Sequence, residues 1–133
     1  MMTPKDQSKA TREICQAAPV VPVLVIDDAG QAPDLARALV AGGLPALEVT
    51  LRTPAALEAI AAMAQVPGGM VGAGTLLTPQ DVRNAKEAGA TFGVSPGATP
   101  RLIAAASEAG LPLLPGASSA SDRGADPIGM TRE

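Results

Sequence analysis

Short apolar segments alternate with helical segments along most of this chain of 133 residues. The apolar segments are predicted strands at residues 20–26, 46–50, 70–74, 91–95 and 112–116. The segments between them have Thr or Pro near their starts and glycine at several of their ends, which are helix start and stop signals. Short strands that alternate with helices are typical of a parallel sheet covered by helices. The pattern predicts an α/β fold, either an open doubly wound sheet or part of an eight-fold barrel.

Three parts of the chain differ in their predicted structure. Residues 1–18 form an amphipathic N-terminal helix that Pro19 ends. Residues 19–117 hold the alternating strands and helices, which we interpret as one partial (β/α) barrel. Residues 118–133 are polar and contain Pro127, so we expect a polar tail or a shortened helix there.

The composition excludes several classes of function. The net charge is −3 and Phe92 is the one aromatic residue, so the chain lacks the basic stripe and stacking aromatics of nucleic-acid binding. No apolar run is long enough to cross a membrane. With no histidine and one cysteine, Cys15, the chain lacks the usual zinc ligands, and we expect neither metal nor cofactor. A single cysteine fits a reducing compartment, so we expect a cytoplasmic protein.

A glutamate and an arginine stand near the end of the second predicted strand, in the segment LEVTLRT. Glu48 lies between Leu47 and Val49, and inward-facing positions alternate along a barrel strand. A carboxylate in that interior is costly unless it is paired or used, and burial raises its pKa, which suits a proton shuttle. Arg52 follows at the strand exit, where its fork of donors suits a small carboxylate. The alternative is a structural ion pair between Glu48 and Arg52.

Turns rich in glycine and other small residues follow the next three predicted strands. In VGAGT the glycines let the backbone approach a ligand, and Thr75 can donate its hydroxyl to that ligand. The segments SPGAT at 95–99 and PGASS at 115–119 place small residues at two further strand exits, which keeps space open in front of a pocket. Each segment taken alone is also typical of an ordinary turn.

Two other groups of charged residues have simpler interpretations. Asp27 and Asp28 resemble the acidic pair of a response-regulator receiver domain, but the aspartate and lysine that a receiver needs at later strand exits are not found there. We interpret the pair as a helix cap. The three lysines, Lys5, Lys9 and Lys86, lie in predicted helices, so we expect them to be solvated rather than nucleophilic.

Taken together, the segments resemble the 2-keto-3-deoxy-6-phosphogluconate (KDPG) aldolase family, which also cleaves 4-hydroxy-2-oxoglutarate (KHG). The resemblance covers residues 19–122 and is carried, in order, by PVVPVLVI, ALVAGGLPALEVTLRT, VGAGTLLTPQ, EAGATFGVSPG and LPLLPGASSASD. It implies a (β/α)8 TIM barrel, of which this chain holds an N-terminal helix and about five βα units. It also implies a homotrimer that takes a small 2-oxo acid and needs no metal.

The resemblance implies the reaction of a class I aldolase. A lysine forms an imine with the pyruvate half of the substrate, the C3–C4 bond breaks, and glyceraldehyde 3-phosphate leaves. With 4-hydroxy-2-oxoglutarate the products are pyruvate and glyoxylate. By the same resemblance, Glu48 is the general acid/base, Arg52 and Thr75 hold the pyruvate carboxylate, and Pro96 lies near the pocket wall.

The family resembled carries its imine lysine on the sixth strand, in a motif like FKFFPAE that this sequence does not contain. We therefore expect the chain alone to be an inactive piece, truncated before that strand. Two alternatives are open. One is a half-barrel module that binds 2-oxo acids or assembles with other chains, and the other is a non-enzymatic domain with an open five-stranded sheet.

Overall fold

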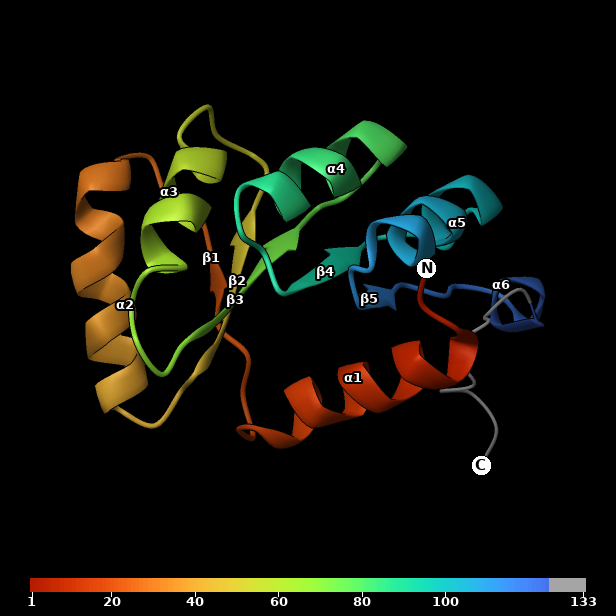
Figure 1. The fold of residues 1–133 in the computed structure, drawn as a ribbon, viewed down its shortest axis with the longest axis horizontal. Helices are drawn as coiled ribbons and strands as arrows, with labels where there is room; N and C mark the ends of the chain where they lie inside the picture. Colours follow the sequence, from red (N-terminus) through yellow and green to blue (C-terminus); the bar gives the residue numbers. More distant parts are fainter. Residues whose placement is uncertain (125–133) are drawn as a thin grey trace.

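The computed structural model of the protein describes residues 1–124, and five parallel strands form one sheet there. The strands are β1 (Val23–Leu24), β2 (Ala46–Thr50), β3 (Met70–Gly74), β4 (Phe92–Ser95) and β5 (Leu113–Pro115). Each strand pairs with the next one along the chain (Figure 1). A doubly wound sheet reverses its strand order at a switch point, whereas sequential order is that of a (β/α)8 barrel. The structure is therefore a partial barrel, as the resemblance implies.

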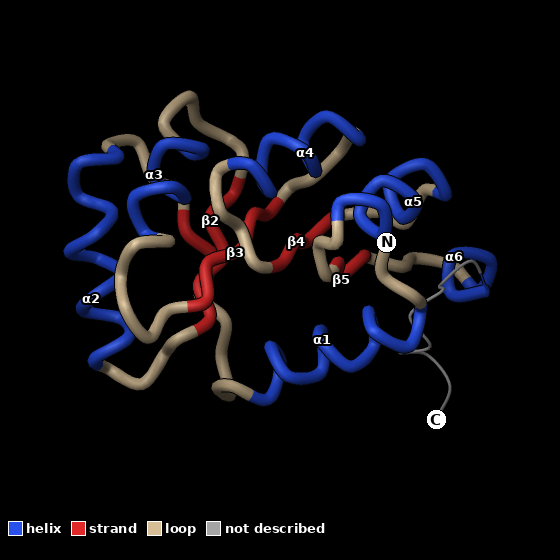
Figure 2. The backbone as a smooth tube through the Cα atoms, viewed as in Figure 1, coloured by secondary structure: helices blue, strands red, loops and turns tan. Residues whose placement is uncertain are grey.

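Helices join the strands and cover the sheet. They are α1 (Pro4–Gln16), the 3-10 helix η1 (Ala29–Gln31), α2 (Ala32–Ala41), α3 (Ala56–Met63), α4 (Pro79–Glu87), α5 (Pro100–Ala109) and α6 (Ala120–Gly124). The strand–helix–strand connections have the same handedness, so α2 to α5 lie on the same face of the sheet. Helix α1 lies on the other face (Figure 2). Most of the predicted polar tail, residues 125–133, lies outside the described residues.

Side-chain caps begin several of the helices, as the sequence predicts. Thr78 accepts a hydrogen bond from the backbone N–H of Asp81, and the Asp81 carboxylate accepts one from the N–H of Thr78. Thr99 caps α5. Asp28 caps η1 by accepting from the N–H of Gly30 at 2.9 Å. These local bonds satisfy donors that a helix start leaves without partners.

The first strand is shorter than predicted, because the ladder covers only Val23–Leu24 of residues 20–26. Pro22 has no N–H to donate, although its carbonyl accepts from the N–H of Glu48 at 3.0 Å. β1 is also an edge of the described sheet, with β2 as its neighbour. Val23 and Val25 are consequently 58% and 55% exposed.

Two apolar cores hold the layers together. The larger core lies between the sheet and α2 to α5, and the strand residues Leu47 and Val49 point into it. The smaller core lies between the sheet and α1, and its buried members are Ile14, Ala46 and Phe92. Because side chains alternate along a strand, Glu48 shares the face of Ala46 rather than that of Leu47. The inner face of the sheet is therefore covered by α1 at the Ala46 end and carries Glu48 toward the strand exits.

The Gln7 side chain links α1 to the start of β5 by two hydrogen bonds. It is 5% exposed, donates to the carbonyl of Leu111 at 3.1 Å and accepts from the N–H of Leu113 at 3.0 Å. Gln7→Leu removes both bonds and leaves buried backbone groups behind, so we expect a loss of about 1–3 kcal/mol in the free energy of unfolding, measured in urea. The exposed Gln16 of the same helix supplies a control, since Gln16→Leu should have little effect. Equal losses in the two variants would contradict this role of Gln7.

Candidate active site

The four predicted site residues lie along the carboxyl ends of three neighbouring strands. Glu48 is in β2, and Arg52 lies in the turn that follows it. Thr75 comes directly after β3, and Pro96 comes directly after β4. The three strands are parallel neighbours, so these exits share one edge of the sheet. Active sites of parallel barrels are built at this edge.

The side chain of Glu48 crosses the neighbouring strand at a glycine. Glu48 pairs in register with Gly72, and Gly74 is the next inward-facing position toward the exit of β3. A methyl carbon placed on Gly74 would overlap the carboxylate and lie 2.8 Å from Cδ of Glu48. Any side chain at position 74 would displace the Glu48 carboxylate from its observed position on the inner face. The sequence pattern marks this glycine for the approach of a ligand, whereas its contact with Glu48 depends on how β2 and β3 pair.

Burial dominates the electrostatics of Glu48. The residue is 9% exposed, and loss of hydration raises the pKa of its carboxyl, while the positive charge of Arg52 acts in the opposite direction. Among the side chains of residues 1–122, which the structure describes, the one ion pair joins Arg37 to Asp34 on α2, so the alternative of a Glu48–Arg52 ion pair is not observed. The Glu48 carboxylate also has no hydrogen-bond partner among these residues. It is therefore available to a ligand.

The raised pKa predicts a pH dependence of stability. A carboxyl with a higher pKa in the folded state binds its proton more tightly there, so stability falls as pH rises from the unfolded pKa through the folded one. We expect Glu48→Gln to remove this fall: the variant gains stability relative to the parent chain near neutral pH and loses the advantage in acid. Urea unfolding from about pH 3 to about pH 8 measures the difference. Glu58→Gln on the exposed face of α3 is the control. If the stability difference from the parent chain were independent of pH for both variants, the burial of Glu48 would be contradicted.

Arg52 lies in a turn rather than on an extended strand. The sequence predicts Arg52 at the strand exit, and β2 ends at Thr50, two residues earlier. Threonine hydroxyls fasten this exit to the end of β1: Thr50 donates to the carbonyl of Leu24 at 3.2 Å, and Thr53 donates to that of Ile26 at 2.5 Å. Arg52 itself is exposed and pairs with no residue in the described part of the chain. Its guanidinium is thus free at a turn that is held in place.

Thr75 has an unusual backbone conformation. It is half-buried and has a φ of 61°, and no other non-glycine residue among residues 1–124 has a positive φ. This region is unfavourable for a β-branched side chain, and such strain is found preferentially at functional sites. The next residue, Leu76, donates its N–H to the carbonyl of Val94 at 3.1 Å, which fixes the turn against β4. The turn therefore holds the Thr75 side chain in a defined place at the exit of β3.

Removing the Thr75 side chain should relieve this strain. Glycine adopts a positive φ without a Cβ clash, so we expect Thr75→Gly to raise the free energy of unfolding by about 0.5–1 kcal/mol. Thr78→Gly is the comparison, because Thr78 has an extended φ of −130° and caps α4, and this variant should lose stability. Thermal unfolding of both variants measures the difference. A loss for Thr75→Gly would show that its side chain stabilises the fold and is not strained.

The exits of β4 and β5 are packed against each other. The N–H of Gly116 donates to the carbonyl of Ser95 at 2.7 Å, and a methyl carbon on Gly116 would lie 2.9 Å from the carbonyl carbon of Pro96. The Ser95 hydroxyl donates to the carbonyl of Gly97 at 2.8 Å. Pro96 itself is exposed beside these bonds. Gly116 is thus a residue of this site that the sequence pattern marked only as small.

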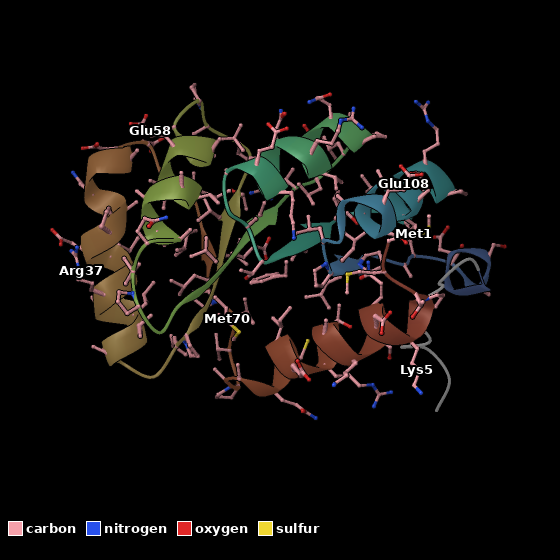
Figure 3. The ribbon with its side chains drawn as sticks, viewed as in Figure 1. Met1, Lys5, Arg37, Glu58, Met70 and Glu108 are labelled. Atoms are coloured by element: carbon pink, nitrogen blue, oxygen red, sulfur yellow. The ribbon has the colours of Figure 1, made fainter. Side chains whose placement is uncertain are left out.

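The lysines lie away from this edge of the sheet. Lys5 and Lys9 are exposed on α1, and Figure 3 shows Lys5 pointing away from the sheet. Lys86 is exposed on α4, where its ammonium donates to the carbonyl of Gly110 at 3.0 Å. In the described residues no group of three or more His, Cys, Asp or Glu side chains could hold a metal ion. Nor does that part contain a helix long and apolar enough to span a membrane.

Comparisons with known proteins agree with this geometry. Residues 11–130 match the family model of KDPG and KHG aldolase. The chain is 48% identical over 119 residues to the KHG/KDPG aldolase of Escherichia coli strain K12, covering 89% of this chain and 56% of that protein. The KDPG aldolase of Zymomonas mobilis ZM4, solved with 3-phosphoglycerate, is 52% identical with a TM-score of 0.82, over 86% of this chain and 55% of that one.

A third relative is the KDPG aldolase of Legionella pneumophila, solved with pyruvate captured as a covalent carbinolamine. It is 39% identical, with a TM-score of 0.80, over 98% of this chain and 60% of that one. The chain spans little more than half the length of the curated relatives it matches. The resemblance inferred from the strand-exit motifs is confirmed by the family model, the identities and the shared fold. The chain belongs to the KDPG and KHG aldolase family.

Proposed function

We propose that this chain supplies the acid/base group and the carboxylate-binding groups of a class I aldolase. The substrates proposed are KDPG, cleaved to pyruvate and glyceraldehyde 3-phosphate, and KHG, cleaved to pyruvate and glyoxylate. The observation that carries the proposal is the buried Glu48 carboxylate on the inner face of the sheet. Its raised pKa, and the exits that bear Arg52 and Thr75 at the same edge, support the three roles.

In the proposed reaction the imine on the pyruvate half draws electrons away from C3. Glu48 takes the proton of the C4 hydroxyl, the C4–O bond becomes a carbonyl, and the electron pair of the C3–C4 bond moves into an enamine. Glu48 then returns the proton to C3, and hydrolysis of the imine releases pyruvate. Arg52 and Thr75 hold the carboxylate of the pyruvate half by charge-assisted and hydroxyl hydrogen bonds. Burial raises the pKa of the Glu48 carboxyl, which favours the protonated form that must return a proton to C3.

In this proposal the lysine that forms the imine is not one of the residues of this chain. Lys5, Lys9 and Lys86 are exposed on helices, whereas a nucleophilic lysine must be desolvated. A complete site thus needs a further polypeptide segment that brings a lysine to the same edge of the sheet. The trimeric assembly and the cytoplasmic location implied by the resemblance remain predictions.

Complementation tests the proposal. The chain is mixed with a polypeptide holding the part of the E. coli relative that this chain does not match, and pyruvate and borohydride are added to trap any imine. We expect a pyruvate adduct on the added polypeptide and cleavage of KDPG by the mixture, while this chain alone stays unmodified. An adduct on this chain would overturn the assignment of the lysine. An assembled mixture that neither traps pyruvate nor cleaves KDPG would overturn the proposed function.

The exposed edge of β1 favours a second candidate, a half-barrel that assembles with other chains. Val23 and Val25 are more than half exposed beside backbone groups that β2 does not pair. Open strand edges of this kind promote association. We expect the sedimentation coefficient to rise with protein concentration, and Val25→Lys to reduce the rise. A single monomeric species at every concentration would exclude this candidate for the isolated chain.

A further inference from the structure

We propose that Phe92 is a positioning residue for Glu48: its ring fills the space over Gly72 and directs the carboxylate across Gly74 toward the strand exits. The geometric part of this proposal stands by itself. Its consequence for catalysis rests on the proposed function, in which Glu48 is the acid/base group. Phe92 has no polar atom in its side chain and takes no part in the chemistry, so its effect is exerted entirely through Glu48.

Glu48, Gly72 and Phe92 lie side by side across three neighbouring strands. Glu48 of β2 pairs in register with Gly72 of β3, and Gly72 pairs with Phe92 of β4. A methyl carbon on Gly72 would overlap the Phe92 ring and lie 2.5 Å from its Cδ2 atom. The ring therefore lies against the Gly72 backbone and occupies the place directly beside Glu48. The Glu48 side chain turns instead toward Gly74, one inward-facing position nearer the exit.

The surroundings of Phe92 hold the ring in place. It is fully buried and forms a core with Ile14 of α1 and with Ala46, against which Met70 also packs. The Met70 side chain reaches into the space between the sheet and α1 (Figure 3). A ring enclosed by strands on one side and a helix on the other cannot swing away from Gly72 without opening this core. The apolar face that it presents also keeps water from one side of Glu48.

The charges near Glu48 do not provide this control. Arg52 is the charged group that acts on Glu48, and it lowers the pKa of the carboxyl, whereas burial raises it. The ionisable side chains of the covering helix are exposed: these are Lys5, Asp6, Lys9, Arg12, Glu13 and Cys15. In this proposal the carboxyl is enclosed by the packing of Phe92 over Gly72 and by the close approach of Gly74, rather than by a charged partner. A change in this packing should therefore appear directly in the titration of Glu48.

The test is the titration of Glu48 in Phe92→Leu, followed by the carboxyl carbon resonance in NMR spectra of the whole chain. Leucine is smaller and not planar, so the side chain of Glu48 can turn back over Gly72 and water can reach it. We expect the pKa of Glu48 to fall toward its ordinary value while the chain stays folded. Phe92→Met has about the same volume as Phe92→Leu, but its unbranched side chain is longer and can still reach over Gly72, so it should give a smaller fall and is the second variant if Phe92→Leu does not fold.

Gly93→Ala provides the matched control. Its added methyl carbon would lie 2.5 Å from Cδ1 of Leu76 on the other face of the sheet, so it crowds a core without touching Phe92. We expect lower stability and an unchanged titration of Glu48. An unchanged titration in both Phe92 variants, or an equal shift in Gly93→Ala, would overturn the proposal. The measurement needs no lysine and no substrate, so it is independent of whether the chain completes an aldolase.

Discussion

Glu48→Gln should lower the kcat of the complemented aldolase about 10²–10⁴-fold, the range of a general acid/base contribution. Glutamine keeps the size and approximate shape of the side chain, so it should fit over Gly74 without the overlap that any larger residue at that glycine would cause. It cannot accept the proton of the C4 hydroxyl or return it to C3. The expected loss is therefore in the chemical step, with a small change in KM. Steady-state kinetics with KDPG as the substrate measure both values.

Trapping separates this role from a binding or folding defect. The Glu48→Gln mixture should still form the pyruvate adduct under borohydride, because imine formation uses the lysine and the carboxylate-binding groups. Glu58→Gln, on the exposed side of α3, should leave both kcat and trapping unchanged. A kcat near that of the unchanged mixture would show that Glu48 is not the acid/base group. Loss of trapping together with turnover would instead indicate that Glu48 helps to bind the 2-oxo acid.

Local sequence patterns predict most of the strands and helices that position this site. The bounds of β2 and β3 are the predicted ones, because each of these strands is an apolar run. The helices α2 and α5 fill two of the segments predicted to be helical, and each has a proline in its first turn and glycine after its end. The alternation of strands and helices alone fits two architectures, which differ in strand order. The motifs at the exits of β2, β3 and β4 decide between them, since these motifs resemble one family of barrels.

Features that depend on register could not be read from the sequence. The overlap between Gly72 and Phe92 joins residues twenty positions apart, and it exists only because β3 and β4 pair in one particular alignment. The positive φ of Thr75 likewise depends on how the turn meets β4. The shortness of β1 arises from its place at the sheet edge and from Pro22. Non-local pairing decides the first two features, and in β1 it acts together with Pro22.

Phe92→Ala should produce the largest loss of stability, about 3–5 kcal/mol in the free energy of unfolding. Phe92 is the one aromatic residue of the chain and the largest fully buried side chain of residues 1–122, whose side chains the structure describes. Its removal leaves a cavity between the sheet and α1, where Ile14 would lose an apolar partner. Small domains have a total stability of about 5–15 kcal/mol, so this one cavity removes a large share. Urea unfolding measures the loss.

The loss of stability in Phe92→Ala should also affect α1 more than the other helices. Leu47→Ala makes a cavity of similar kind in the other core, between the sheet and α2 to α5, and should cost about 2–5 kcal/mol. In hydrogen exchange, the amides of α1 should lose more protection in Phe92→Ala than in Leu47→Ala, because only Phe92 contacts the core that α1 covers. Equal losses of α1 protection in the two variants would mean that Gln7, through its bonds to Leu111 and Leu113, holds α1 by itself. The inner core would then contribute little to closing this face of the sheet.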